Sequence, residues 1–190
     1  LKSFLINNYV NSYETFYEKV NNIEPGSILI FENNKIKIER YFNISRYFSS
    51  KVKYKKFDLE EFDQVLTDSI KSRLISDVEV GVFLSGGLDS SLIASVAKNL
   101  GKDIKSYTLA FGEKSFDESI KANYVSNYLD ISNEKFIISK NDLSNIDEII
   151  LSFGEPVADT SIVPTYFLSK FASKQVKVCL GGDGGDEMFY

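Results

Sequence analysis

Histidine is absent from this 190-residue chain, and cysteine occurs once. The absence of histidine removes the commonest general base, the nucleophile systems that pair serine or cysteine with histidine, and most zinc sites. Any chemistry must therefore use carboxylates, lysine, hydroxyls, backbone amides or a bound ion. The single Cys179 cannot form an internal disulfide, which favours a reducing compartment, and its place in an apolar run favours an inert thiol.

Long apolar runs and an excess of basic charge are also missing. No stretch reaches the roughly 18–20 apolar residues of a membrane span, and residues 1–16 lack the build of a signal peptide. The 27 acidic and 22 basic side chains give a formal net charge of −5, without the basic face that wraps nucleic acid. We expect a cytoplasmic globular chain with no membrane or nucleic-acid partner.

The N-terminal part carries one clear structural signal. Two alternating runs, residues 27–32 and 35–40, flank Asn33 and Asn34, which is typical of a β-hairpin. A two-stranded hairpin alone is marginally stable, so these strands need further partners, and a homo-oligomer is one expected outcome. We expect three regions, which are an N-terminal part at 1–46, a linker at 47–57 and a second domain at 58–190.

Helical and strand patterns alternate from Asp58 onward. The expected strands are residues 78–84, 106–111, 135–138 and 177–180, and the expected helices are residues 59–74, 90–100, 117–129, 143–153 and one that Pro164 opens. In the third of these helices we expect Ile120, Tyr124, Val125 and Tyr128 to face inward. This alternation predicts an α/β fold with right-handed crossovers and a parallel sheet covered on both faces.

A glycine-rich and serine-rich turn, Ser85–Ser91, lies between the first of these strands and its helix. Ligands of open α/β sheets bind at this end of the strands, where glycines allow a tight turn and free helix amides attract an anion. The pattern lacks the lysine of a Walker-type loop and the spacing of a dinucleotide fingerprint. A phosphate cradle is the functional interpretation, and a turn with nothing bound is the alternative. Because Asp89 would repel phosphate, its presence predicts a bridging Mg²⁺.

A second glycine-rich segment, Gly181–Glu187, follows the last apolar strand. Four glycines within five positions allow backbone to pass close to a ligand. The segment does not have the residue order of an EF-hand, and on its own it also fits a flexible turn with solvated acids. Since both loops end parallel strands, they lie on one edge of the sheet, where Asp89 and Asp186 could bind one metal ion.

The segment VGVFL at 80–84, followed by SGGLDSS, resembles the pyrophosphate-loop (PP-loop) ATP pyrophosphatase motif. Together with VCLGGDGGDE at 178–187, it makes the chain similar to the glutamine-hydrolysing asparagine synthetase family. The stretch 22–42 is similar to the end of that family's glutaminase domain. The resemblance implies a PP-loop domain preceded by a β-hairpin remnant of an N-terminal nucleophile domain, and we expect an internal fragment of a longer enzyme.

The resemblance further implies ATP-dependent asparagine synthesis, in which ATP and Mg²⁺ adenylate aspartate and ammonia from glutamine displaces AMP. The residues that match the family's ATP and pyrophosphate positions are Leu84, Ser85, Gly86, Gly87, Asp89, Ser90, Ser91, Leu109 and Gly182. Asp89 and Asp186 match the Mg²⁺ ligands, and Asp183 matches an acidic catalytic position linked to the substrate and intermediate. Fixed amides and Mg²⁺ would stabilise the charge that adenylation creates, so histidine is not needed.

The sequence departs from the family pattern in three places. The N-terminal cysteine nucleophile and the catalytic lysine of the family have no counterpart here, and residues 155–163 contain no basic residue. Two alternatives therefore stay open. One is a related synthetase with another acceptor, of the β-lactam-forming or peptide-cyclising type, and the other is a nucleotide-binding module without turnover.

Overall fold

The computed structural model describes residues 1–46, 56–112, 117–139, 142 and 146–189. Within these ranges the chain forms two compact units. The first comprises residues 1–57 and 147–160, and the second comprises residues 58–146 and 161–190. The sequence carries no signal that residues 147–160 group with the N-terminal part. Most of the expected linker, at 47–55, lies outside the described residues.

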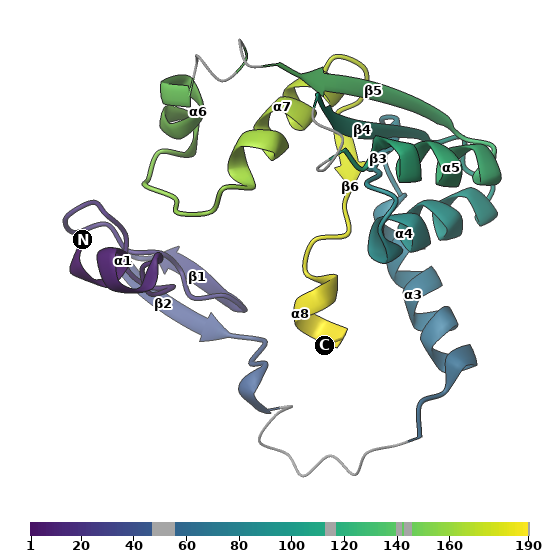
Figure 1. Ribbon diagram of the computed structural model, residues 1–190. Helices are drawn as coiled ribbons and strands as arrows, with labels where there is room; N and C mark the ends of the chain where they lie inside the picture. Colours follow the sequence, from purple (N-terminus) through teal and green to yellow (C-terminus); the bar gives the residue numbers. More distant parts are fainter. Residues whose placement is uncertain (47–55, 113–116, 140–141, 143–145, 190) are drawn as a thin grey trace. The chain divides into compact units, whose positions relative to one another are not determined.

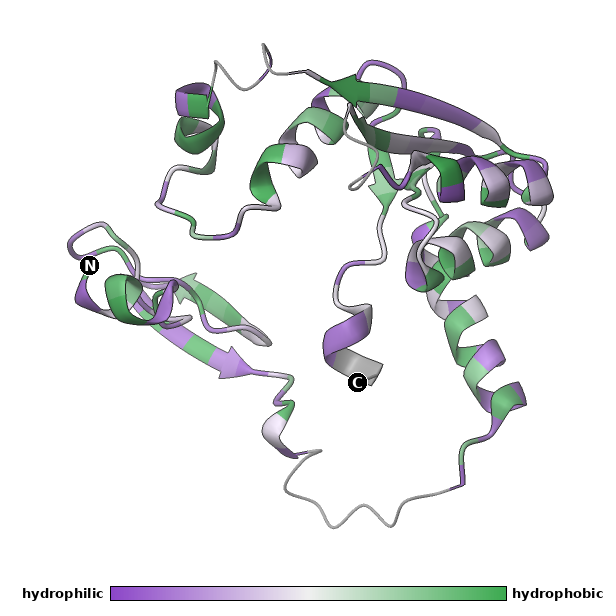
Figure 2. Ribbon diagram, viewed as in Figure 1, coloured by the Kyte–Doolittle hydropathy of each residue, from purple (hydrophilic) through white to green (hydrophobic). Residues whose placement is uncertain are grey.

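The first unit is built around the predicted hairpin, whose strands are β1 (Ser27–Glu32) and β2 (Lys35–Arg40). Asn33 and Asn34 both have positive φ, 50° and 61°, which is the backbone of a tight hairpin turn. The hairpin prediction is therefore confirmed. Figure 2 shows β1 hydrophobic along most of its length and β2 alternating. The unit also contains the short helix α1 (Lys2–Asn7) and most of α6 (Ile146–Phe153).

Hydrogen bonds tie residues 147–160 to the N-terminal part of the first unit. The Phe16 amide donates to the Glu155 carboxylate at 3.1 Å, and the Tyr17 hydroxyl donates to the Gly154 carbonyl. In α6, Ile149 is fully buried, whereas the apolar side chains of Ile146, Ile150 and Phe153 remain about half exposed. The expected start of this helix, Leu143, lies outside the described residues.

The second unit is a four-stranded parallel sheet with helices on both faces (Figure 1). Its strands are β3 (Val80–Phe83), β4 (Lys105–Phe111), β5 (Ser132–Ile138) and β6 (Val178–Leu180), and their order across the sheet is β5-β4-β3-β6. Its helices are α3 (Leu59–Arg73), α4 (Leu88–Asn99), α5 (Ser119–Leu129), α7 (Ile162–Ala172) and the short α8 (Gly185–Phe189). The parallel-sheet prediction is confirmed, and each expected strand is present, although β5 begins three residues earlier than expected.

Alternate residues of the central strands supply two separate cores. Val82 and Leu84 pack with the helices α3, α4 and α5, and Val82 is fully buried. Phe83 belongs instead to a cluster around Tyr107, together with Phe171 of α7. Because successive strand residues point to opposite faces, these clusters hold the two helical layers against the sheet.

The inward face predicted for α5 is wrong. Ile120, Tyr124 and Tyr128 are 72%, 73% and 80% exposed, and Val125 is only partly buried. The buried face consists of Ser119, Ala122 and Ser126. Small side chains let α5 approach the sheet and α4 closely, and at this helix that packing overrides the apolar periodicity. In α3 the apolar side chains of Leu59 and Val65 are likewise exposed, whereas Ile70 and Leu74, at the end of the helix, are buried.

Candidate nucleotide site

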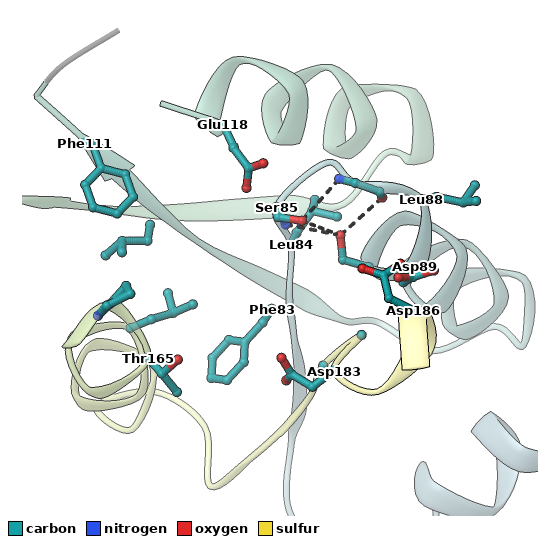
Figure 3. A pocket seen from close by; sticks show the side chains of 17 residues that line it. Phe83, Leu84, Ser85, Leu88, Asp89, Phe111, Glu118, Thr165, Asp183 and Asp186 are labelled. Carbon is teal, nitrogen blue, oxygen red and sulfur yellow. Dashed lines mark hydrogen bonds between the residues drawn. The ribbon is translucent and has the colours of Figure 1, made fainter. Parts of the chain in front are cut away.

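A cleft of about 690 Å³ opens at the carboxyl ends of the sheet strands in the second unit (Figure 3). After β3 the chain passes through α4 to β4, which lies on one side of β3, whereas β6 lies on the other side of β3. The order in which strands are added to the sheet therefore reverses between β3 and β6. Open α/β sheets bind ligands at such a switch point.

The loop after β3 is held by its own serines. The Gly87 amide donates to Ser85 Oγ at 3.2 Å, the Ser85 amide donates to Ser90 Oγ at 3.3 Å, and the two hydroxyl oxygens lie 3.0 Å apart. These contacts shape a compact turn whose residues Ser85, Gly87, Asp89 and Ser90 line the cleft. The predicted turn thus lies at the cleft, and hydrogen bonds of its serine hydroxyls hold its shape.

Helix α4 begins two residues earlier than expected, at Leu88, with Gly87 at its N-cap. Glycine has no side chain with which to cap the helix. The first helical hydrogen bond of α4 runs from the Ser91 amide to the Gly87 carbonyl, at 3.1 Å. The helix start at Leu88, Asp89 and Ser90 lines the cleft, where amides and helix dipole favour an anion.

Two residues of the predicted phosphate set do not line the cleft, namely Gly86 and Ser91. Gly86 has φ +80°, and a Cβ there would lie 2.6 Å from backbone atoms of Lys121 and Ala122 in α5. The glycine is therefore required for packing against α5. Ser91 Oγ is buried and has no hydrogen-bond partner among the described residues.

The loop after β6 passes directly over the start of α4. A Cβ on Gly182 would lie 3.0 Å from the Asp89 Cβ, and a Cβ on Gly185 would lie 2.8 Å from the Asp89 carboxyl group. Only glycine leaves room for the Asp89 carboxylate at this point. The close approach of the two glycine-rich loops, expected from their shared sheet edge, is thus present.

Three carboxylates line the cleft at this end, those of Asp89, Asp183 and Asp186 (Figure 3). No group of three or more aspartate, glutamate, cysteine or histidine side chains within the described ranges is arranged to enclose a metal ion. Mg²⁺ typically takes one or two protein carboxylates and completes its shell with water and substrate phosphates. Two carboxylates beside a helix N-terminus fit that ion.

The other half of the cleft is apolar and extends over the end of β4. Its walls come from Phe83 and Leu84, from Leu109 and Phe111 of β4, and from Pro164 and Leu168 of α7. An apolar slot beside a turn suited to an anion matches the two parts of a nucleotide, the base and the phosphates. Leu109, predicted to contact adenosine, lies in this slot.

Sequence reasoning left Glu118 and Thr165 without a definite function, yet both line the cleft. For Glu118 the available signal was its place just after β4, at the ligand-binding edge of the sheet. Its neighbour Asp117 has a local task, since its carboxylate accepts the Ser119 amide at 3.0 Å. This hydrogen bonding to Ser119 holds the pKa of Asp117 below its usual range.

Cys179 lies in β6 beside Tyr107, outside the cleft lining. The thiol is partly buried, and this burial raises its pKa to about 11. A thiolate is the reactive form, so the thiol is poorly reactive near neutral pH. The structure agrees with the interpretation of an inert cysteine.

Comparison with known proteins gives a family match and several relatives. The family model described as asparagine synthase matches residues 61–190. The glutamine-hydrolyzing asparagine synthetase 1 of Bacillus subtilis is 34% identical over 197 residues, covering 100% of this chain and 30% of that protein. A putative glutamine-hydrolyzing asparagine synthetase 2 of Methanocaldococcus jannaschii is 34% identical over 183 residues, covering 95% of this chain and 36% of that protein. The chain thus spans about a third of the length of these relatives.

Solved structures share the fold of the second unit. The NMN synthetase of Francisella tularensis matches with a TM-score of 0.52 and 20% identity, over 70% of this chain and 58% of that one. A glutamine-dependent NAD⁺ synthetase of Acinetobacter baumannii, solved in complex with ADP, matches with a TM-score of 0.52 and 19% identity, over 73% and 28%. Both likenesses confirm the predicted fold class. Within the described ranges, no helix is both long and apolar enough to cross a membrane.

Proposed function

The chain belongs to the asparagine synthase family, and from this premise we propose that it carries the ATP-binding part of an asparagine-forming enzyme. In the proposed reaction an oxygen of the aspartate β-carboxylate attacks the α-phosphorus of ATP, and pyrophosphate leaves. Ammonia then attacks the activated acyl carbon, and AMP leaves with the transferred carboxylate oxygen. Glutamine is the proposed source of ammonia and the cytoplasm the proposed compartment.

The cleft carries this proposal, because it joins an anion-binding turn, two candidate metal ligands and an apolar slot in one cavity. We assign the pyrophosphate to the hydroxyls of Ser85 and Ser90 and to the first amides of α4. We assign the adenosine to the backbone of Leu84 and Leu109, with Gly182 beside it. Fixed hydrogen-bond donors at the phosphates stabilise the charge that develops as pyrophosphate departs.

Asp89 and Asp186 are the proposed holders of Mg²⁺. When bound, this ion neutralises phosphate charge and assists the departure of pyrophosphate. Without a cation the two carboxylates would repel the phosphates, so we propose that ATP binds here as its magnesium complex. Asp183 lines the same cleft from the loop after β6, and we assign it to the substrate and intermediate.

Gly86 and Ser91 take a different place in this proposal. Neither lines the cleft, so we propose that they support the turn and do not contact pyrophosphate directly. Gly86 allows α5 to pack against the turn, and Ser91 stands at the first helical hydrogen bond of α4.

Amino-acid-dependent exchange between ATP and pyrophosphate tests the proposed function. The full-length protein is assayed with Mg²⁺ and a panel of carboxylate substrates. We expect exchange with aspartate alone. Exchange with a different carboxylate would move the protein to a related synthetase with another acceptor. ATP binding without exchange on any substrate would indicate a nucleotide-binding module without turnover.

A further inference from the structure

Four polar side chains lie together behind the predicted phosphate-binding turn. Ser106 and Thr108 of β4 are 0% and 1% exposed, and both contact the amide group of Asn133 in β5, at 3.0 Å and 2.9 Å. Asn133 in turn reaches the amide group of Asn123 in α5 at 3.1 Å. The hydroxyls of Ser106 and Thr108 are buried and must be satisfied internally, which makes their arrangement specific.

Thr108 also contacts the turn itself. Its Oγ1 lies 2.7 Å from the Leu84 carbonyl oxygen, the shortest contact in this group of four side chains. The Leu84 amide donates to the Tyr107 carbonyl at 2.9 Å, so both backbone polar groups of Leu84 are bonded to β4. Leu84 lines the cleft, and Ser85 follows it directly.

The hydroxyl of Thr108 has only one proton, which limits the hydrogen bonds it can donate. Two acceptors lie within reach of that proton, the Leu84 carbonyl oxygen at 2.7 Å and Asn133 Oδ1 at 2.9 Å. Asn133 Oδ1 also faces the Ser106 hydroxyl at 3.0 Å, and the Asn133 NH₂ group donates to Asn123 Oδ1 at 3.1 Å. The Leu84 carbonyl and Asn133 therefore compete for the Thr108 proton, and the shorter contact is the one to Leu84.

The same group reaches the turn by a second route. Asn123 lies in α5, next to Ala122, whose backbone nitrogen would be 2.6 Å from a Cβ on Gly86. The polar group therefore fixes Leu84 on one side of Ser85, and it holds the helix that abuts Gly86 on the other side.

We propose that Thr108 and Asn133 are positioning residues for nucleotide binding, in that they hold the Ser85–Ser90 turn in its anion-binding shape. This inference rests on the proposed function of the cleft. Neither residue lines the cleft, so they act through the Leu84 backbone. A turn that is already ordered loses less conformational entropy when the nucleotide binds.

Calorimetric titration of the full-length protein with Mg·ATP and with magnesium pyrophosphate tests the proposal. Thr108→Val keeps the shape of the side chain and removes the donor. We expect both dissociation constants to rise about 3- to 10-fold, the range that one net hydrogen bond is worth, with the KM for aspartate unchanged. Thr108→Ser retains the hydroxyl and should bind as the wild type does.

Ser106→Ala is the matched control, because Ser106 is equally buried in the same strand but does not contact Leu84. We expect it to lower the melting temperature as Thr108→Val does, with unchanged nucleotide affinity. Equal loss of affinity in Ser106→Ala and Thr108→Val would overturn the proposal, because it would indicate a general effect on stability. Unchanged affinity in Thr108→Val would also overturn it.

Asn133→Asp tests the competition for the Thr108 proton, even if Thr108→Val does not fold. A carboxylate is a stronger acceptor than the Asn133 amide oxygen, so it would draw the Thr108 proton away from the Leu84 carbonyl. We expect weakened Mg·ATP binding, and wild-type affinity in this variant would contradict the assignment. A wild-type protein that binds no nucleotide would refute the proposed function itself, whereas wild-type binding with insensitive variants refutes only the positioning role.

Discussion

Asp89 is the residue on which the two glycine-rich loops converge. Its carboxyl group lies where a side chain on Gly185 would be, and it lines the same cleft as Asp186. Neither carboxylate is useful to a phosphate ligand without a cation between them, because like charges at short range repel. We therefore propose that the pair makes nucleotide affinity depend on Mg²⁺.

Replacing either aspartate by asparagine should abolish Mg²⁺-dependent ATP binding. The change removes one negative charge and one of the two carboxylates that we propose as ligands of the ion. Calorimetry with and without Mg²⁺ measures the effect. Asp103→Asn, an exposed acidic position outside the cleft lining, is the control and should bind normally. Unaltered affinity in both cleft variants would refute the shared metal site.

Gly185→Ala should weaken Mg·ATP binding about tenfold or more, a loss of ~1.4 kcal/mol, without unfolding the chain. The added Cβ would lie 2.8 Å from the Asp89 carboxyl group, which must rotate away to make room. Gly112→Ala is the matched control, since a Cβ there meets no atom of the residues that the structure describes within 4 Å. Equal affinities in the two alanine variants would show that the position of the Asp89 carboxylate is unimportant.

Cys179 should react slowly with iodoacetamide in the folded protein. Burial raises the pKa of its thiol to about 11, so the reactive thiolate is scarce near pH 8, and alkylation should accelerate about tenfold per pH unit below the pKa. Folding favours the neutral thiol, because the pKa of Cys179 is higher in the folded chain than in the unfolded chain. This preference stabilises the fold at lower pH and is lost as the pH rises through about 11. Mass spectrometry follows the alkylation, and equal rates in the folded and urea-unfolded chain would contradict burial.

At the scale of elements, α3 shows how local chemistry determines a helix boundary. Asp58 adopts an extended backbone and accepts the amides of Glu60 and Glu61 at 3.0 and 3.1 Å. An acid just before an apolar helical stripe is a common sequence signal for such a cap.

Asp58→Ala should destabilise the second unit by about 1 kcal/mol, the usual cost of losing such a cap. Urea unfolding followed by circular dichroism measures the change. Asp63→Ala, on an exposed position of the same helix, should leave the midpoint unchanged or raise it. A cap variant as stable as the wild type would show that the helix start depends on packing alone.

The strands of the sheet were predictable because buried parallel strands are short apolar runs bounded by turns. The inward face of α5 was not. Ile120, Tyr124 and Tyr128 follow helical spacing, yet the tight approach to Gly86 and the sheet selects Ala122 and its small neighbours for the interior. Which face of a helix packs inward depends on how closely the helix approaches the sheet. The spacing of apolar residues in the sequence does not carry that information.

The site was predictable to a similar extent. The serines, glycines and aspartates of both loops carry recognisable local patterns, and most of them line one cleft. Phe111, Glu118 and Thr165 also line the cleft, but they lie in separate elements that only the folded sheet brings together. The contact of Thr108 with Leu84 likewise joins residues 24 positions apart.

At the scale of the whole molecule, residues 147–160 are covalently continuous with α7, which lines the cleft, while their contacts lie in the first unit. The hairpin of that unit leaves Phe31 and Ile36, paired across its strands, each 65% exposed. The expected association of the hairpin β1–β2 with further strands or a second copy stays a prediction.

The central claim is that this protein activates the aspartate β-carboxylate by joining it to AMP. The most direct measurement follows ¹⁸O from labelled aspartate β-carboxylate during a single turnover of the full-length protein with Mg·ATP and ammonia. The account predicts one ¹⁸O atom in AMP. The attacking carboxylate oxygen stays bonded to the α-phosphorus when ammonia attacks the acyl carbon and AMP leaves. Label in inorganic phosphate, or AMP formed without label, would contradict adenylation of aspartate.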